Sequence, residues 1–203
     1  MADATVQIDR IDAESIQVPI IGTTPLIVHR FSEKAKRQML DAMQGKRTPK
    51  VAKDPEAEYM AAFYELKDGR YGFPSVGFKQ AMVSATRLFG KDVSMVLVRQ
   101  TIFVHGEVGK EQPLVAIEGE PQMREDVVTV GRGGHDLRYR PEFSEWRADL
   151  HITYVKASWT RGSVLTLLDA AGMGVGIGEW RPEKNGDFGT FKIDETRDVE
   201  VLS

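Results

Sequence analysis

Apolar residues occupy every second position in residues 147–156, at Ala148, Leu150, Ile152 and Tyr154. Side chains of a strand point to opposite faces in turn, so this spacing predicts a β-strand with one buried face. Runs rich in β-branched residues predict further strands at 15–22, 101–105, 114–117 and 188–193, with the run 93–105 containing a central strand. Pro19 interrupts the first strand and indicates an edge position or a bulge, because proline has no amide hydrogen to donate.

Apolar residues three or four positions apart predict helices. The expected helices cover residues 32–45, 55–66, 75–89 and 160–171. Ser32 and Asp54 suit the N-cap positions of the first two, and Pro55 suits the first turn of the second. The third helix is expected to bury one face, formed by Phe78, Ala81, Met82, Ala85 and Leu88.

Residues 127–143 predict a projecting β-hairpin, with its tip at Gly131, Gly133 and Gly134. Without insertions, the order of elements is strand, helix, strand, strand, helix, strand. This is the β-α-β-β-α-β pattern of ferredoxin-like folds, in the α+β class. We therefore expect residues 1–203 to form a single domain with two insertions: a basic helical insertion at about 30–70 and a hairpin insertion at about 107–146.

Composition excludes several classes of protein. The 203 residues contain no cysteine, which excludes disulfides and thiolate chemistry and argues against structural zinc. The four histidines lack metal-ligand spacing, so we expect no metal and no cofactor. The N-terminus is acidic, and no apolar run approaches membrane-spanning length. These features predict a cytoplasmic protein without membrane contact.

Charge is unevenly distributed along the chain. The net charge is −3, yet residues 30–53 contain eight basic and two acidic side chains. Such asymmetry is typical of a protein with a polyanionic partner. A solvated helix face followed by a flexible loop explains the pattern equally well. The basic residues are Arg30, Lys34, Lys36, Arg37, Lys46, Arg47, Lys50 and Lys53.

The stretch 172–191 contains six glycines together with Arg181, Pro182 and Lys184. Glycine loses more conformational freedom on folding than any other residue, so this density indicates backbone that passes close to another group or turns where a Cβ would clash. Backbone amides displayed in this way can bind a phosphate, and the guanidinium of Arg181 suits the same anion. Alternatively, Arg181 and Pro182 cap the helix end or contribute an ion pair.

Two segments together resemble a known family. FPSVGFKQAMVSATR (73–87) is similar to the turn and first core helix of the RAMP superfamily of RNA-binding proteins in CRISPR effector complexes. GIGEWRPEKNGDFGTF (176–191) resembles the glycine-rich loop of that superfamily, whose fold is a modified RNA-recognition motif (RRM). The resemblance implies an RNA-binding subunit that holds single-stranded RNA by its backbone. It also implies a homo-oligomer or filament of subunits side by side.

The sequence and the resemblance together give a set of expected contacts with single-stranded RNA, with single-stranded DNA as the second choice. Cations near the glycines are expected to meet phosphates, and those of the hairpin to grip the strand. Tyr139 and Trp146 are more often packing residues than base platforms, and Trp180 is expected to pack against the core. The expected RNA-binding residues are Arg30, Lys34, Arg37, Lys46, Arg47, Lys50, Lys53, Lys79, Arg87, Arg132, His135, Arg138, Tyr139, Arg140, Gly174, Gly176, Gly178, Arg181 and Lys184.

We expect no catalytic activity, because no histidine has an identifiable partner for proton transfer. His105 and His151 are expected to be structural. If the chain were an RNA endonuclease, as some RAMP proteins are, His29 and Asp41 would be the residues to test. The main alternative is a structural, self-assembling interaction protein of phage origin that does not bind nucleic acid.

Overall fold

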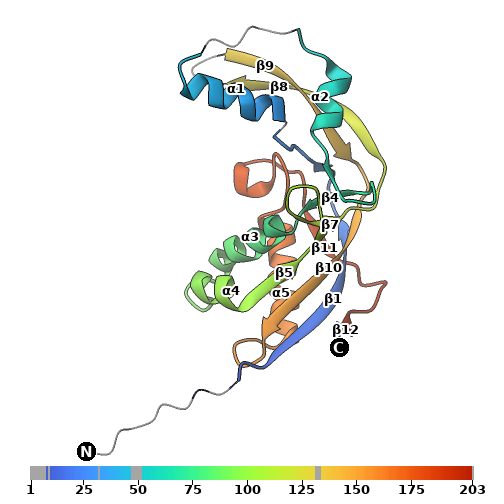
Figure 1. The fold of residues 1–203 in the computed structure, drawn as a ribbon. Helices are drawn as coiled ribbons and strands as arrows, with labels where there is room; N and C mark the ends of the chain where they lie inside the picture. Colours follow the sequence, from blue (N-terminus) through green and yellow to red (C-terminus); the bar gives the residue numbers. More distant parts are fainter. Residues whose placement is uncertain (1–7, 9, 32, 47–51, 131–133, 203) are drawn as a thin grey trace, which may run out of the picture.

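The computed structural model describes residues 8, 10–31, 33–46, 52–130 and 134–202, and Figure 1 shows their arrangement. Helices accompany three β-sheets, and every strand pairing between the named strands is antiparallel. The predicted α+β class with antiparallel sheets is therefore confirmed.

The largest sheet has β1 (Ala13–Gly22) beside β10 (Arg147–Val155), which in turn pairs with β5 (Ile102–His105). On its other side β1 pairs with β11 (Phe191–Ile193) and β12 (Glu200–Leu202). The helices α3 (Ser75–Ala85) and α5 (Arg161–Gly174) lie on one face of this sheet (Figure 1).

The main hydrophobic core lies between this sheet and these helices. The alternation predicted for β10 is confirmed, since Ala148, Leu150, Ile152 and Tyr154 are all buried. The predicted face of α3 is buried too, except for Leu88, which is largely exposed. The chain tightens after α3 into the 3₁₀ turn η1 (Thr86–Phe89), so Leu88 leaves the helical stripe.

The prediction that Pro19 marks an edge or a bulge needs correction, because β1 has neighbours on both sides. β11 pairs with residues 20–22 of β1, and β12 pairs with residues 15–17. Pro19 lies in the gap between these two ladders, where its carbonyl accepts a hydrogen bond from the Asp194 amide at 2.9 Å. The missing amide hydrogen therefore breaks no ladder bond there.

Two smaller sheets lie above the largest one in Figure 1. The first has the order β3-β4-β7-β6, formed by β3 (Tyr64–Glu65), β4 (Tyr71–Pro74), β7 (Pro113–Ala116) and β6 (Glu107–Val108). The second has the order β2-β9-β8, formed by β2 (Leu26–Ile27), β9 (Gly134–Phe143) and β8 (Pro121–Val130). Strands β8 and β9 form the predicted hairpin, whose residues 131–133 lie outside the described part of the chain. The helices α1 (Glu33–Met43) and α2 (Pro55–Ala61) lie at the hairpin end of the molecule (Figure 1).

Several boundaries differ from the prediction. The helix expected at 55–66 ends at Ala61, and the chain continues into β3. Residues 95–101 form the helix α4 (Met95–Thr101), capped by the Ser94 hydroxyl, and β5 is an edge strand rather than a central one. Helix α5 runs three residues beyond the predicted end, and the acidic tail contains the unpredicted strand β12.

Candidate nucleic-acid interface

The glycines of residues 172–191, here called the glycine-rich loop, pack against the chain's own backbone. A Cβ added to Gly189 would lie 1.8 Å from the carbonyl oxygen of Ile177, and one added to Gly178 would lie 2.4 Å from that of Ile27. A Cβ added to Gly172 would lie 2.0 Å from the carbonyl oxygen of Phe191. The close approach expected from the glycines is therefore made within the molecule.

Most of the loop amides described are already paired. The Gly176 amide donates to Ala171, the Ile177 amide to Gly189 and the Gly189 amide to Pro25, at 2.8 to 2.9 Å. Gly174 lies within α5. These bonds give the loop a rigid internal scaffold and occupy the amide of Gly176. Phosphate contact at Gly174, Gly176 and Gly178 stays a prediction.

Side chains fix the loop to its surroundings as well. The Arg181 guanidinium donates to the carbonyl of Gly178 at 2.9 Å and to the Glu183 carboxylate at 2.8 and 3.1 Å. Glu183 also accepts a 2.8 Å bond from the Ser84 hydroxyl of α3, and these donors lower the pKa of its carboxyl. Arg181 thus forms the ion pair that the sequence left open as its alternative role.

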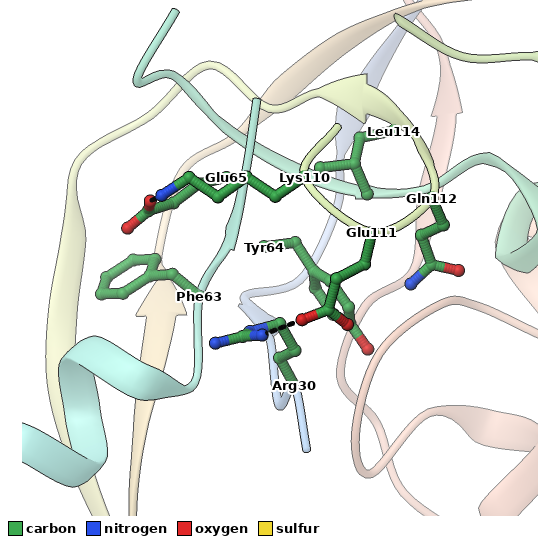
Figure 2. Close-up of a pocket in the computed structure, with 8 residues that line it drawn as sticks. All are labelled: Arg30, Phe63, Tyr64, Glu65, Lys110, Glu111, Gln112 and Leu114. Carbon is green, nitrogen blue, oxygen red and sulfur yellow. Dashed lines mark hydrogen bonds and ion pairs between the residues drawn. The ribbon is translucent and has the colours of Figure 1, made fainter. Parts of the chain in front are cut away.

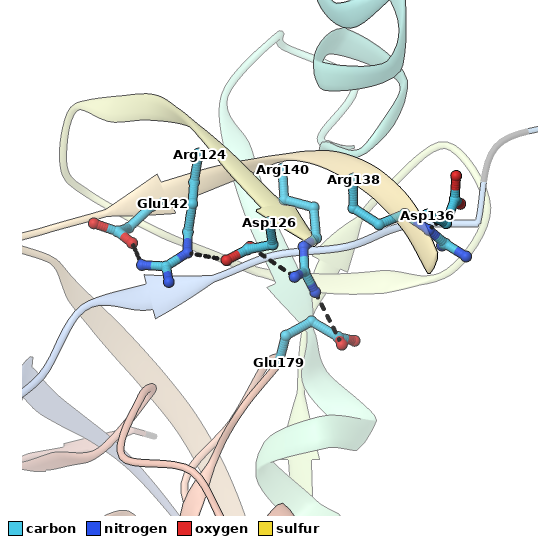
Figure 3. A network of polar contacts seen from close by, with 7 residues as sticks. All are labelled: Arg124, Asp126, Asp136, Arg138, Arg140, Glu142 and Glu179. Atoms are coloured by element: carbon cyan, nitrogen blue, oxygen red, sulfur yellow. Dashed lines mark hydrogen bonds and ion pairs between the residues drawn. The ribbon is translucent and has the colours of Figure 1, made fainter. Parts of the chain in front are cut away.

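Arg140 fixes the loop to the hairpin (Figure 3). Its side chain is only 2% exposed and pairs with Asp126 at 2.7 Å and with Glu179 at 3.3 Å. Buried charged groups are stable in proteins when they are paired in this way. The expected RNA contact at Arg140 needs correction, since a side chain this deeply buried does not offer its charge to a ligand at the surface.

The other hairpin cations also lie beside carboxylates. Arg124 pairs with Asp126 and Glu142, and Arg138 pairs with Asp136 (Figure 3). Tyr139 and the exposed His135 both lie on β9. A hydrogen bond with Glu125, together with burial, raises the pKa of the Tyr139 hydroxyl. The described part of the hairpin is therefore close to neutral. Arg132 lies outside the described residues.

The basic insertion loses part of its charge to distant carboxylates. Arg30 pairs with Glu111 beside a cavity of about 170 Å³ (Figure 2). Lys36 pairs with the same carboxylate. Lys53 pairs with Asp136 at 2.6 Å and with Glu58. Arg37 and Lys46 are exposed, and Lys34 lies in α1. Arg47 and Lys50 lie outside the described residues.

A different set of cations has no carboxylate within ion-pair distance in the described part of the chain. Lys79 lies in α3, Arg87 in η1, Lys91 in the turn between η1 and α4, and Arg99 in α4. Lys184 lies in the 3₁₀ turn η2 (Pro182–Lys184). We call these five residues the helical-face cations. Lys79 lies 4.5 Å from the centre of the Phe103 ring, and burial together with the charge of Arg99 lowers the pKa of its ammonium group.

Sequence reasoning missed the setting of Trp180. The side chain is 45% exposed, although packing against the core was expected. Its φ angle is +54°, which is uncommon for a residue with a large side chain. No local pattern predicted this exposure, because the loop's shape depends on contacts with β2 and with residues 186–189.

Three of the four histidines take part in two pairs of rings. His105 and His151 face each other across β5 and β10 with ring centres 4.5 Å apart, beside a cavity of about 350 Å³. His29 stacks on Phe31, and burial lowers the pKa of its imidazole. Among the described residues, no group of three or more His, Asp or Glu side chains is placed to hold a metal ion. Catalysis through His29 or Asp41 stays untested.

No protein-family model matches the sequence, and no curated protein matches it. Within the described residues, no helix is both long and apolar enough to span a membrane. The chain is similar in structure to Cmr6 from Pyrococcus furiosus, with 10% identity and a TM-score of 0.46 over 91% of this chain and 100% of that one. It is also similar to a chain of the type III-B Cmr-beta complex bound to cognate target RNA, with 11% identity and a TM-score of 0.44 over 94% of this chain and 61% of that one.

Proposed function

We propose that this chain is a non-catalytic subunit that binds single-stranded RNA through its helical-face cations. The observation that supports this most directly is the contrast between two groups of basic residues. Those of the hairpin and several of the insertion are neutralised by carboxylates, whereas Lys79, Arg87, Lys91, Arg99 and Lys184 are not. Cations without protein counter-ions are available to phosphates, and phosphate contacts dominate affinity for nucleic acid.

The loop and the helical face are joined, which places two of these cations on neighbouring elements. The Ser84 hydroxyl bonds to Glu183 at 2.8 Å, and Leu88 is the side chain nearest Gly174 of α5. Arg87 follows Ser84 by three residues, while Lys184 follows Glu183 directly. A single strand could therefore contact both cations in passing from η1 to η2.

We also assign the central sheet to the ferredoxin-like class of RAMP proteins. Its spatial order β11-β1-β10-β5 corresponds to the fourth, first, third and second strands of a β-α-β-β-α-β unit. The insertions fall between the first strand and first helix and between the two middle strands. Side-by-side assembly of several subunits along the strand belongs to the same proposal.

Salt dependence of binding tests the proposal. Fluorescence anisotropy with a labelled single-stranded RNA 12-mer should give a slope of log K against log salt of about −3, if about four phosphates are neutralised. Arg87→Gln and Lys184→Gln should each weaken binding and flatten this slope. Lys67→Gln is the matched control, because Lys67 is an exposed cation on the β3–β4 turn and belongs to none of the elements that carry the helical-face cations. Absent or salt-independent binding would contradict the proposal.

A second candidate is an interaction protein that does not bind nucleic acid. The observation that favours it is the apolar surface of α1, where Met39, Leu40 and Met43 are exposed. Large exposed apolar groups often mark sites of protein association. This candidate predicts self-association that weakens when Met43 is replaced by serine, together with no affinity for RNA.

A further inference from the structure

The backbone of Trp180 is held in a conformation that tryptophan rarely adopts. At φ +54° it lies in the left-handed region, which glycine enters without a steric penalty and a residue with a Cβ does not. Strained residues persist only where the surrounding structure imposes their conformation, and they cluster at functional sites. The loop has six glycines, yet the residue at this position is tryptophan.

The neighbours that impose this conformation are all in place. The Trp180 carbonyl accepts a 3.0 Å bond from the Phe188 amide, and a Cβ on Gly186 would lie 1.8 Å from the same carbonyl oxygen. On the preceding residue, the Glu179 amide donates to Ile27 at 2.9 Å, and its carboxylate pairs with Arg140. The loop therefore fixes the direction in which the indole leaves the backbone.

The indole does not supply the burial and hydrogen bonding that usually account for a tryptophan. Trp146 is 2% exposed and donates from Nε1 to the Thr24 carbonyl at 2.9 Å. Trp159 is half-buried and donates to the Thr101 hydroxyl at 2.7 Å. Trp180 is 45% exposed, and within the described part of the chain its indole nitrogen donates to no acceptor.

We infer that Trp180 is a stacking platform for one nucleobase of the bound strand, an inference that rests on the proposed function. An exposed indole in a fixed direction offers a flat apolar face, and stacking on such a face is how single strands are held without sequence preference. Lys184 lies four residues further on, exposed and without a carboxylate within ion-pair distance. It is placed in the same loop to neutralise a phosphate of the stacked nucleotide.

Two variants and two RNA probes test this role. Trp180→Ala should bind a labelled 12-mer of oligoadenylate about 5- to 140-fold more weakly than the unchanged protein, the range measured for loss of one stacked base. Trp180→Phe keeps an aromatic face, so its affinity for the same RNA should lie within a few-fold of that of the unchanged protein. On a 12-mer with abasic riboses, Trp180→Ala and the unchanged protein should bind equally, because no base remains to stack.

Trp180→Gly separates a binding role from a structural one. Glycine relieves the left-handed strain, so this variant should keep or raise the Tm while losing RNA affinity as Trp180→Ala does. A clear drop in Tm for both variants would make Trp180 a packing residue and overturn the inference.

The remaining outcomes distinguish this inference from the proposed function. If the unchanged protein binds RNA with the expected salt slope and Trp180→Ala binds equally well, base stacking is excluded and the proposed function stands. If the unchanged protein binds neither RNA probe, both proposals fail. If Trp180 proves necessary only for association with a protein, the base-stacking role is excluded as well.

Discussion

Arg140 shows how the meaning of a charge depends on its partners. In the sequence it is one of three polar residues in a row on a hairpin, and it was interpreted as a contact for RNA. In the structure its guanidinium lies between Asp126 and Glu179, which come from different parts of the chain. Without Arg140, Glu179 loses its ion-pair partner and Asp126 keeps only Arg124 among the described cations, and a buried charge that loses its partner is destabilising.

Arg140→Ala should therefore lower the free energy of unfolding by about 3 kcal/mol, below the upper end for fully buried pairs because Glu179 is partly exposed. Arg138→Ala is the matched control on the same strand. Its pair with Asp136 is about one-third exposed, so less than about 1 kcal/mol should be lost. Equal losses in urea unfolding would contradict the structural role of Arg140.

The spacing of apolar residues predicted which side chains of β10 are buried, since alternation is a local property. Ion-pair partners could not be predicted in this way. Glu111 lies 81 residues from Arg30 and 75 from Lys36, and it reaches both because β6 and β7 bring it back beside the insertion. The exposure of Trp180 could not be predicted from local patterns either, because it also depends on contacts between distant parts of the chain.

The glycine-rich loop makes the close backbone contacts that its composition predicts, but it makes them with other parts of the same chain. Its glycines meet carbonyl groups of the same chain at Gly172, Gly178 and Gly189. Such density is needed because a loop packed this closely leaves no room for Cβ atoms. It follows that substitution of these glycines should affect folding before it affects any ligand.

Gly189→Ala should cost about 2 kcal/mol or more in unfolding experiments, because it combines a φ of +67° with a clash against the Ile177 carbonyl. Gly69→Ala is the control for the conformational part alone. Gly69 has a φ of +89° but no atom within 4 Å of the added Cβ, so about 1 kcal/mol should be lost. A loss at Gly189 no larger than at Gly69 would show that the loop yields to the extra atom.

Elements of nine or more residues were mostly located from the sequence, and the short strands β5, β7 and β11 were expected close to where they lie, whereas β3 and β6 were not expected. Helices α1, α3 and α5 and strands β1 and β10 appear within a few residues of their expected positions. Strands β3 and β6 have two residues each, too few for a period to be detected. Residues 95–101 were misassigned because β-branched residues there favour a strand, whereas the Ser94 cap and tertiary packing stabilise α4.

Considered together, the sheets explain why local patterns give the order of elements but not the distribution of charge over the surface. The strand order β11-β1-β10-β5 joins residues more than 120 positions apart. Contacts between distant segments also decide ion pairs such as that of Arg30 with Glu111. The sequence excess of positive charge at residues 30–53 is partly cancelled in this way. Of the helical-face cations, Lys79, Arg87 and Lys184 were among the expected RNA contacts, whereas Lys91 and Arg99 were not. All five lie beyond ion-pair distance of any carboxylate in the described part of the chain.

Strand β8 has one further consequence for how the protein behaves at high concentration. It is ten residues long, and it pairs with β9 on one side only among the described strands. A free edge of this length can template intermolecular β-pairing and so drive aggregation, and an outward charge counteracts it. Glu125 is that charge, placed between the exposed side chains of Met123 and Val127.

Glu125→Val would join these side chains into an apolar stripe along the open edge. We expect this variant to form oligomers or precipitate as its concentration rises, detected by light scattering, while Glu125→Gln stays dispersed. Concentration-independent scattering from both variants would mean that the hairpin's twist already protects the edge. Glu125 is thus expected to protect the protein from aggregation by preventing β-pairing between the open β8 edges of two molecules.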